Sequence, residues 1–225
     1  MFGPVERTAL EWRLLYGRIF KTVIILSELK NPDLAVEEGK FGLCIQDNTI
    51  LNYWNLLQAD KTKLWITNGV SKSWTTVSTK DNSDWFSKQA GMVKKVVSMM
   101  PVHFQVSYKN SVTSGKSITV CSSEVFYIPR RFVADFADLF NLVGNLEIHH
   151  KVAIPMFFLA IDSPQNFDSV FSTMIYKEQP PSTNSSSLYS AKVPAVHPWN
   201  VSSEQDFIKL IRTMAEVGLY FTIHY

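Results

Sequence analysis

Residues 41–65 have the sequence FGLCIQDNTILNYWNLLQADKTKLW, in which an apolar run stops abruptly at polar residues. The run at 41–46 is nearly all apolar, a pattern typical of a buried strand. Asp47 and Asn48 follow it directly. Because ligands of open α/β sheets bind beyond the carboxyl ends of the strands, the sequence predicts a ligand site at these two residues if the strand is central.

The rest of the chain alternates between predicted strands and predicted helices. Strands are predicted at residues 20–26, 64–67 and 102–108, and one or two more strands at 118–128. Helices are predicted at residues 52–58, 84–100, 131–143, within 149–161 and from 202 to about 216. Pro155 is expected to kink or split the segment 149–161. This alternation favours an α/β layer fold.

Domain organisation follows from the absence of any clear linker, so we predict a single domain over residues 1–225 with an irregular loop region at 163–195. Asn52 is the expected cap of the helix at 52–58, and Gly144 is the expected stop of the helix at 131–143. The helix at 84–100 has one apolar stripe with spacings of four and three, formed by Phe86, Ala90, Val93, Val97 and Met100.

Composition restricts the class of protein. The chain has 225 residues, of which 46% are hydrophobic, and a net charge of +2, so we expect an ordinary folded protein with no nucleic-acid partner. Cys44 and Cys121 fit no metal spacing and are expected to be small buried hydrophobes, with a single disulfide as the alternative. No apolar run reaches the roughly 18 residues of a membrane span, and residues 1–12 lack the features of a signal peptide.

Two triplets, beginning at Asn184 and Asn200, match the acceptor pattern for N-glycosylation. The first lies in a run of Ser, Pro and Asn that is typical of a surface loop. Such triplets also arise by chance, so each is weak support for a secretory compartment.

The polar residues that follow the strand at 41–46 match the chemistry of a cation site. The Asp47 carboxylate can hold a divalent cation, which in turn neutralises a diphosphate. Asn48 adds a carbonyl oxygen and Thr49 a hydroxyl. A buried strand, an acidic turn and then aromatic residues is a layout by which nucleotide-sugar transferases hold Mn²⁺ or Mg²⁺. The alternative is that Asp47 and Asn48 form a turn and cap the next element.

Six long stretches carry a resemblance to a known family. They are residues 12–28, 46–67, 100–109, 124–139, 149–169 and 193–200, which include WRLLYGRIFKTVIILSE, QDNTILNYWNLLQADKTKLWIT and EVFYIPRRFVADFADL. Over nearly its whole length the chain resembles the plant STELLO proteins. The resemblance implies a nucleotide-sugar transferase-like fold, called GT-A-like, with a mixed, mainly parallel sheet flanked by helices. It also implies the lumenal region of a glycosyltransferase anchored in the Golgi membrane and linked to assembly and trafficking of cellulose synthase complexes.

Three features depart from the family pattern and suggest a truncated member, in which the fold is incomplete. Asn48 stands where the family has a second carboxylate, and the loss of one charge should weaken a divalent site. Residues 29–40 form a short connection between two strands, where we expect the family to have a longer segment that helps to form the nucleotide pocket. The chain also begins without the membrane anchor and ends in a tail unlike the family.

Other candidate site residues are spread along the chain. His197 is similar to the late histidine that completes the metal shell in many such transferases, with a loop histidine as the alternative. Glu147 is a candidate base for the acceptor hydroxyl and His150 a candidate for the acceptor pocket, with surface roles as the alternatives. Trp54 could stack on a sugar and Arg130 could grip a diphosphate, with packing and a surface position as the alternatives. Thr49 completes the predicted substrate-binding set.

Two main functions follow from these predictions. The first is a metal-dependent glycosyltransferase that uses a nucleotide sugar and Mn²⁺ or Mg²⁺. The second is a non-catalytic Golgi assembly factor on a degenerate transferase scaffold, which binds cellulose synthase subunits through exposed aromatic residues and the loop at 163–195. A defective fragment without independent function is a third, weaker reading.

Overall fold

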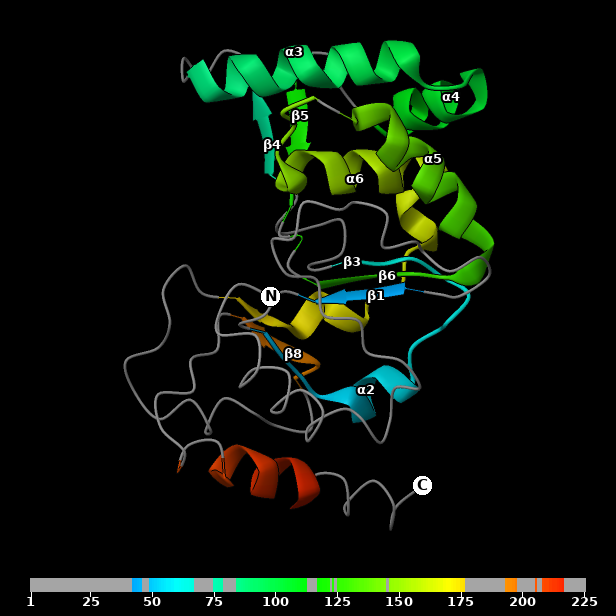
Figure 1. The fold of residues 1–225 in the computed structure, drawn as a ribbon. Coiled ribbons are helices and arrows are strands. Elements are labelled where there is room, and N and C mark those ends of the chain that lie inside the picture. Colours follow the sequence, from blue (N-terminus) through cyan, green and yellow to red (C-terminus); the bar gives the residue numbers. More distant parts are fainter. Residues whose placement is uncertain are drawn as a thin grey trace. The chain divides into compact units, whose positions relative to one another are not determined.

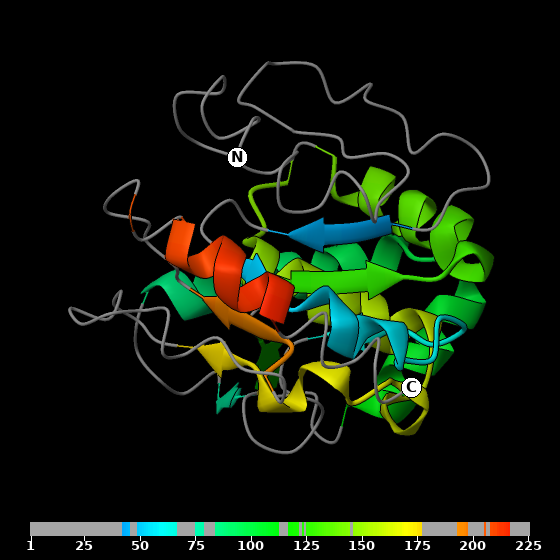
Figure 2. The ribbon, with the colours of Figure 1, turned by 90° about the horizontal axis from the view of Figure 1, so that it is seen from below.

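The protein divides into two compact units in the computed structural model. Figures 1 and 2 show its helices and strands in two views. The structure describes residues 42–45, 49–66, 75–78, 84–112, 117–121, 123, 125–144, 146–176, 193–197, 205 and 208–216. Unit 1 comprises Met1–Ala35, Ile45–Leu57 and Ile175–Tyr225, and unit 2 comprises Val36–Cys44 and Gln58–Met174. The assignment of residues 1–225 to one domain stays a prediction.

Unit 2 contains two small sheets, except that Ile45, the last residue of β1 (Gly42–Ile45), is assigned to unit 1. The first sheet has the strand order β1-β6-β3, with β6 at Val125–Ile128 and β3 at Trp65–Ile66. β3 runs antiparallel to β6 and pairs Trp65 with Tyr127 and Ile66 with Phe126. The second sheet pairs β4 (Thr75–Ser78) with β5 (Ser117–Val120), also antiparallel. The predicted segment 118–128 is therefore two strands, and they belong to different sheets.

The core of unit 2 is built around helix α6 (His150–Ile161), which is apolar on all sides. Met156 and Phe157 belong to a cluster shared with α3 (Asp84–Met99), α4 (Val102–Ser111) and α5 (Val133–Val143). Ile154 and Phe158 belong to a second cluster, with Leu64, Ile66 and Ile128 of the β1-β6-β3 sheet region. α6 is thus a central helix that packs on helices and on the sheet (Figure 1).

Pro155 does not split α6, which corrects that part of our expectation. The helix continues from His150 to Ile161 with Pro155 inside it. Proline lacks the N–H that would bond the carbonyl of Lys151, four residues earlier. That carbonyl instead accepts the N–H of Cys121, which follows β5, at 3.0 Å. The lost helical hydrogen bond is therefore replaced by one from a neighbouring segment. Cys121 itself is buried, as predicted.

Two further predictions about the fold are wrong. Residues 102–108 are not a strand but the start of α4, because Phe104 and Tyr108, one helical turn apart, are both buried while Val102 is 75% exposed. The described sheets are also not mainly parallel. The pairs β3–β6 and β4–β5 are antiparallel, and so is the pair of β2 (Ile50–Leu51) with β8 (Ala195–His197), whereas β7 (Ile175–Tyr176) is parallel to β8. A mixed helix-and-strand fold is confirmed, and the GT-A-like arrangement stays a prediction.

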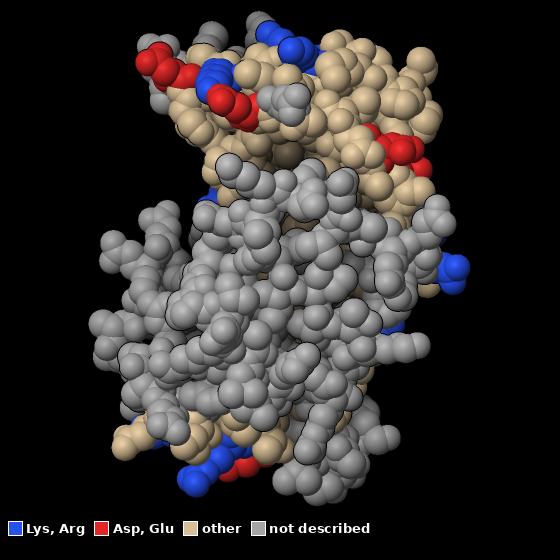
Figure 3. Space-filling view, viewed as in Figure 1, with Lys and Arg blue, Asp and Glu red and all other residues tan. Residues whose placement is uncertain are grey.

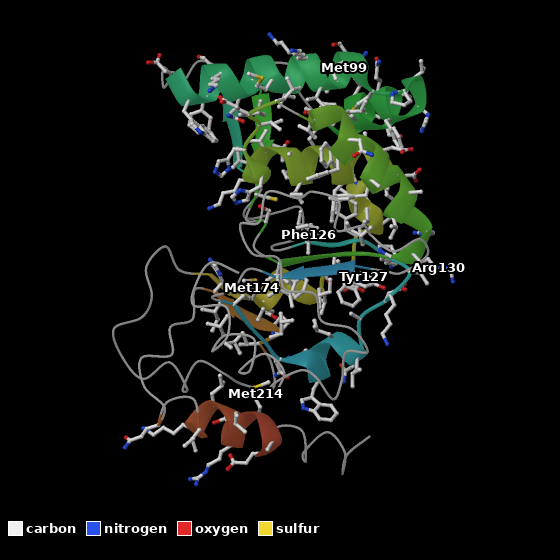
Figure 4. All side chains as sticks on the ribbon, viewed as in Figure 1. Met99, Phe126, Tyr127, Arg130, Met174 and Met214 are labelled. Atoms are coloured by element: carbon white, nitrogen blue, oxygen red, sulfur yellow. The ribbon has the colours of Figure 1, made fainter. Side chains whose placement is uncertain are left out.

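Unit 1 contains the sheet β2-β8-β7, formed by Ile50–Leu51, Ala195–His197 and Ile175–Tyr176. Helix α2 (Tyr53–Leu57) follows β2, and the backbone N–H of Asn55 donates to the carbonyl of Asn52 where the helix begins. The last helix is described at residues 205 and 208–216 and buries Leu210 and Met214 (Figure 4). Both helices lie where the sequence predicts them. The predicted strand at 20–26 lies outside the described residues.

The predicted helices at 84–100 and 131–143 are confirmed as α3 and α5. α5 is preceded by a short 3-10 turn, η1 (Arg130–Phe132). Two further 3-10 turns, η2 (Pro164–Asn166) and η3 (Val170–Thr173), lie in the segment predicted to be irregular. Among the helices of the described residues, none is long and apolar enough to cross a membrane.

Two glycines should respond in opposite directions to substitution by Ala. Gly144 ends α5 with φ of 38°, a conformation that L-residues rarely adopt, so Gly144→Ala should lower the free energy of unfolding by about 1–2 kcal/mol. Gly91 lies inside α3 with no atom within 4 Å of an added Cβ, so Gly91→Ala should raise it by about 0.5–1 kcal/mol. Urea denaturation measures both, and equal effects of the same sign would contradict the backbone described at Gly144.

Candidate functional site

The β2–β8 ladder brings together two predicted site residues, Thr49 and His197. Ile50 pairs with Val196 and Leu51 with Ala195 in the antiparallel register. Continued by one residue, this register places Thr49 opposite His197. Thr49 Oγ1 and His197 Nδ1 are hydrogen-bonded at 2.8 Å. The backbone pairing therefore delivers the two side chains to one place although 148 residues separate them in the sequence.

Thr49 and His197 are buried, and the strand that carries His197 is paired on both of its edges. Thr49 is 0% exposed and His197 is 7% exposed. β8 is the middle strand of its sheet, and on its other side Tyr176 of β7 pairs with His197 in parallel register. Buried polar groups are costly unless they are hydrogen-bonded, so this bond fixes the orientation of the imidazole ring. The imidazole ring of His197 is therefore held in one orientation, which is what a specific contact by this ring requires.

The predicted cation ligands Asp47 and Asn48 lie outside the described residues. Asp47 is only two residues before Thr49, so the Cα atoms of the two are no more than about 7 Å apart. Among the described residues, no three His, Cys, Asp or Glu side chains are grouped closely enough to hold a metal ion.

The chemistry of the pair fits a histidine ligand whose ring is oriented by a second residue. The Thr49 hydroxyl is hydrogen-bonded to Nδ1 of His197, so coordination by this ring would have to use Nε2. For Nε2 to coordinate, Nδ1 must carry the proton and donate it to Thr49 Oγ1. Metal-binding histidines commonly donate their other N–H to an oxygen in this manner.

Glu147 and His150 lie in unit 2, at the start of α6. Glu147 is exposed and its Oε2 accepts a hydrogen bond from Lys88 Nζ at 2.5 Å. This hydrogen bond, with the positive charge of Lys88, lowers the pKa of the Glu147 carboxyl. The His150 ring stacks on His149 with centroids 4.3 Å apart. Glu147 and His150 therefore belong to one surface cluster, which also contains Lys88 and His149.

The sequence analysis missed the buried residue that organises this cluster. Gln89 of α3 accepts the N–H of His149 at 2.8 Å and donates to the carbonyl of Glu147 at 3.3 Å. Trp85, Lys88 and Gln89 are spaced by three and four residues, so they share one face of α3. That spacing is the signal in the sequence that could have placed them together.

The remaining predicted site residues occupy different surroundings. Trp54 is half-buried in α2, in the same unit as Thr49. Arg130 is exposed at η1 (Figure 4), whereas the neighbouring Arg131 lies 3.7 Å from the Asp162 carboxylate. Asn184 and Asn200 lie outside the described residues.

The chain is similar over most of its length to plant proteins that are named glycosyltransferases. "Probable glycosyltransferase STELLO2" of Arabidopsis thaliana is 62% identical over 236 residues, and "Probable glycosyltransferase STELLO1" is 61% identical over 235 residues. Each match covers 95% of this chain. The resemblance is thereby confirmed, and the chain is a partial member of the STELLO family. It spans 31% and 30% of the length of these two relatives.

The relatives carry additional residues inside the matched stretch. Because the match of 236 residues exceeds the 225 residues of this chain, at least eleven positions of STELLO2 have no counterpart here. This number is compatible with a longer family segment in place of residues 29–40, and its location there stays a prediction. No protein-family model matches the chain, and no solved structure matches it.

Proposed function

We propose that this chain contributes the cation-binding part of a nucleotide-sugar-dependent glycosyltransferase. The observation that carries the proposal is the buried hydrogen bond of His197 with Thr49, a residue that follows Asp47 by two positions in the sequence. The names of the relatives support a sugar transfer as the reaction class.

The proposed roles follow from the side-chain chemistry. His197 Nε2, the Asp47 carboxylate and the Asn48 carbonyl oxygen would hold Mn²⁺ or Mg²⁺. When bound, the cation supplies positive charge that stabilises the leaving diphosphate. Thr49 orients the imidazole, and Trp54, in the same unit, is a candidate for contact with the donor sugar. We leave the acceptor base unassigned, because the ion pair with Lys88 lowers the pKa of Glu147 and makes that carboxylate a weaker base.

The test is thermal stabilisation of the full chain by a panel of nucleotide sugars with and without Mn²⁺. We expect at least one nucleotide sugar to raise Tm only when Mn²⁺ is present, because a ligand that binds the folded state stabilises it. Asp47→Ala should abolish this shift. Asp138→Ala, which removes an exposed carboxylate of α5, is the matched control and should retain it. A Mn²⁺-dependent shift that survives in Asp47→Ala would refute the proposed ligand set.

The wider biological role is a further part of the proposal and rests on the family resemblance. We place the chain on the lumenal side of the Golgi apparatus, in assembly or trafficking of cellulose synthase complexes during cell-wall synthesis. Co-precipitation of the tagged chain with cellulose synthase subunits tests the partner. A shift in mobility after removal of N-glycans, lost in the double variant Asn184→Gln/Asn200→Gln, tests the compartment.

A non-catalytic scaffold is the second candidate, and two features of the sequence favour it. The chain lacks at least eleven residues that STELLO2 has within the match, and Asn48 is an amide where the resemblance implies a second carboxylate. Both changes should weaken binding of a nucleotide sugar. Retained association with cellulose synthase subunits without any Mn²⁺-dependent stabilisation would establish the scaffold and exclude the transferase.

A further inference from the structure

A second surface of the protein combines an exposed tryptophan with stacked imidazoles and an ion pair. Trp85, in the first turn of α3, is 40% exposed although it is a large aromatic residue. Its ring lies edge to face with His149, with centroids 5.6 Å apart, and His149 in turn stacks on His150. We propose that this cluster, Trp85 with His149, His150, Glu147 and Lys88, is a binding surface for a neutral oligosaccharide.

The residues of this surface are held by contacts within unit 2. The Trp85 ring is held on a second side by Phe86, at 4.8 Å and nearly perpendicular, and Phe86 packs against the core of unit 2. Gln89 is buried and its amide is hydrogen-bonded to the backbone of both Glu147 and His149. His149 Nδ1 accepts the N–H of Lys151 and so caps α6. A preformed surface binds with a smaller loss of conformational entropy than a mobile one.

The combination of groups matches the two kinds of surface that a pyranose presents. The C–H groups on the flat face of a sugar ring carry a small positive charge and attract the negative face of an aromatic ring. The hydroxyl groups at the rim of the sugar both donate and accept hydrogen bonds. Glu147, which is 78% exposed, and Lys88 offer a charged acceptor and a charged donor beside the ring. Figure 3 shows acidic and basic side chains next to each other over α3.

The charge of the cluster favours a neutral sugar over a nucleotide or another phosphate ligand. Lys88 is already paired with Glu147 at 2.5 Å, so the pair has no net charge. The exposed carboxylate would repel the negative charge of a diphosphate. This site lies in unit 2 and uses none of the residues proposed to hold the cation, so it is a function in addition to the one proposed above.

The test is calorimetric titration of the full chain with cellohexaose, maltohexaose and uridine diphosphate. The β-1,4 linkages of cellohexaose give a flat, extended chain that presents the C–H faces of its rings, so it should bind. The α-1,4 linkages of maltohexaose curve the chain, so it should bind more weakly. Trp85→Ala should reduce the affinity for cellohexaose about tenfold or more, and Trp85→Phe should retain most of it because stacking is preserved. Phe140→Ala, which removes an aromatic residue that is 57% exposed on α5, is the matched control and should bind like wild type.

Three outcomes would overturn the proposal. They are the absence of binding to both oligosaccharides, equal affinity of Trp85→Ala and wild type, and binding of uridine diphosphate but not sugar that depends on Trp85. Asp47→Ala and His197→Ala should bind cellohexaose normally. Failure of the cation site and failure of this surface are therefore separate results.

Discussion

Replacement of Phe158 by Ala is expected to lower the free energy of unfolding by about 3–5 kcal/mol, the largest effect on stability that we predict for this chain. Phe158 is fully buried in α6, on the side that packs toward the β1-β6-β3 sheet. Its ring makes edge-to-face contacts with three other rings, those of Phe126, Phe136 and Phe167, at centroid distances of 5.9–6.2 Å.

The size of the effect follows from how these contacts are distributed. Phe126 comes from β6, Phe136 from α5 and Phe167 from the segment after η2, so one ring joins three parts of unit 2. Removal of the ring loses the free energy gained by burying it. It also leaves a cavity that the closely packed neighbours cannot fill. Aromatic pairs contribute about 0.5–1.5 kcal/mol each beyond the buried area, which places this site toward the upper end of the range.

Urea denaturation followed by circular dichroism measures the change. Phe140→Ala in α5 is the matched control, because Phe140 is exposed and its loss should change stability by no more than about 0.5 kcal/mol. Phe158→Leu should lie between the two, since it leaves a smaller cavity. If Phe158→Ala and Phe140→Ala had equal effects, α6 would not be the centre of the core.

Much of this core was predictable because its elements have clear periodicity. The stripe that contains Ala90 and Val93 predicted α3, and both residues are buried. α4 was not predictable in this way. Its polar residues at 103, 105 and 107 alternate with apolar ones as in a strand, and only the contacts of Phe104 and Tyr108 with the rest of the core select the helix.

Hydrogen bonds between residues far apart in the sequence could not be predicted from sequence patterns. The bond from Cys121 to the carbonyl of Lys151 explains why Pro155 does not split α6, and it joins residues 30 positions apart. Gln89, whose amide holds the residues on both sides of Ile148, is a similar case. Local periodicity carries no information about such partners, because they depend on how distant segments pair.

The candidate cation site shows the same division between local and non-local information. The sequence analysis proposed His197 as a metal ligand and Thr49 as a substrate contact, as two separate candidates. The register of β2 with β8 makes them a hydrogen-bonded pair. Thr49 thereby changes from a candidate substrate contact to a residue that positions the histidine.

Thr49→Val tests this positioning role and is the prediction with the largest expected effect on binding at a residue that is not itself a proposed ligand. Valine keeps the shape of threonine but removes the hydroxyl that His197 Nδ1 contacts. Loss of a residue that orients a metal ligand typically weakens metal affinity about 10–100-fold. We therefore expect Mn²⁺ to bind Thr49→Val about 10–100-fold more weakly than wild type, and His197→Ala to show no saturable binding.

Conservative replacement separates positioning from general stability. Thr49→Ser keeps the hydroxyl and should restore Mn²⁺ affinity close to that of wild type, even where its missing methyl group lowers Tm. Thr213→Val, in the last helix, removes a hydroxyl that bonds only the carbonyl of Lys209 and should leave Mn²⁺ affinity unchanged. Titration of the bound fraction against Mn²⁺ concentration gives the affinity independently of Tm. Equal Mn²⁺ affinity in Thr49→Val and Thr49→Ser would show that the buried hydrogen bond does not act on the cation site, and His197 would then be a structural residue of the β2-β8-β7 sheet.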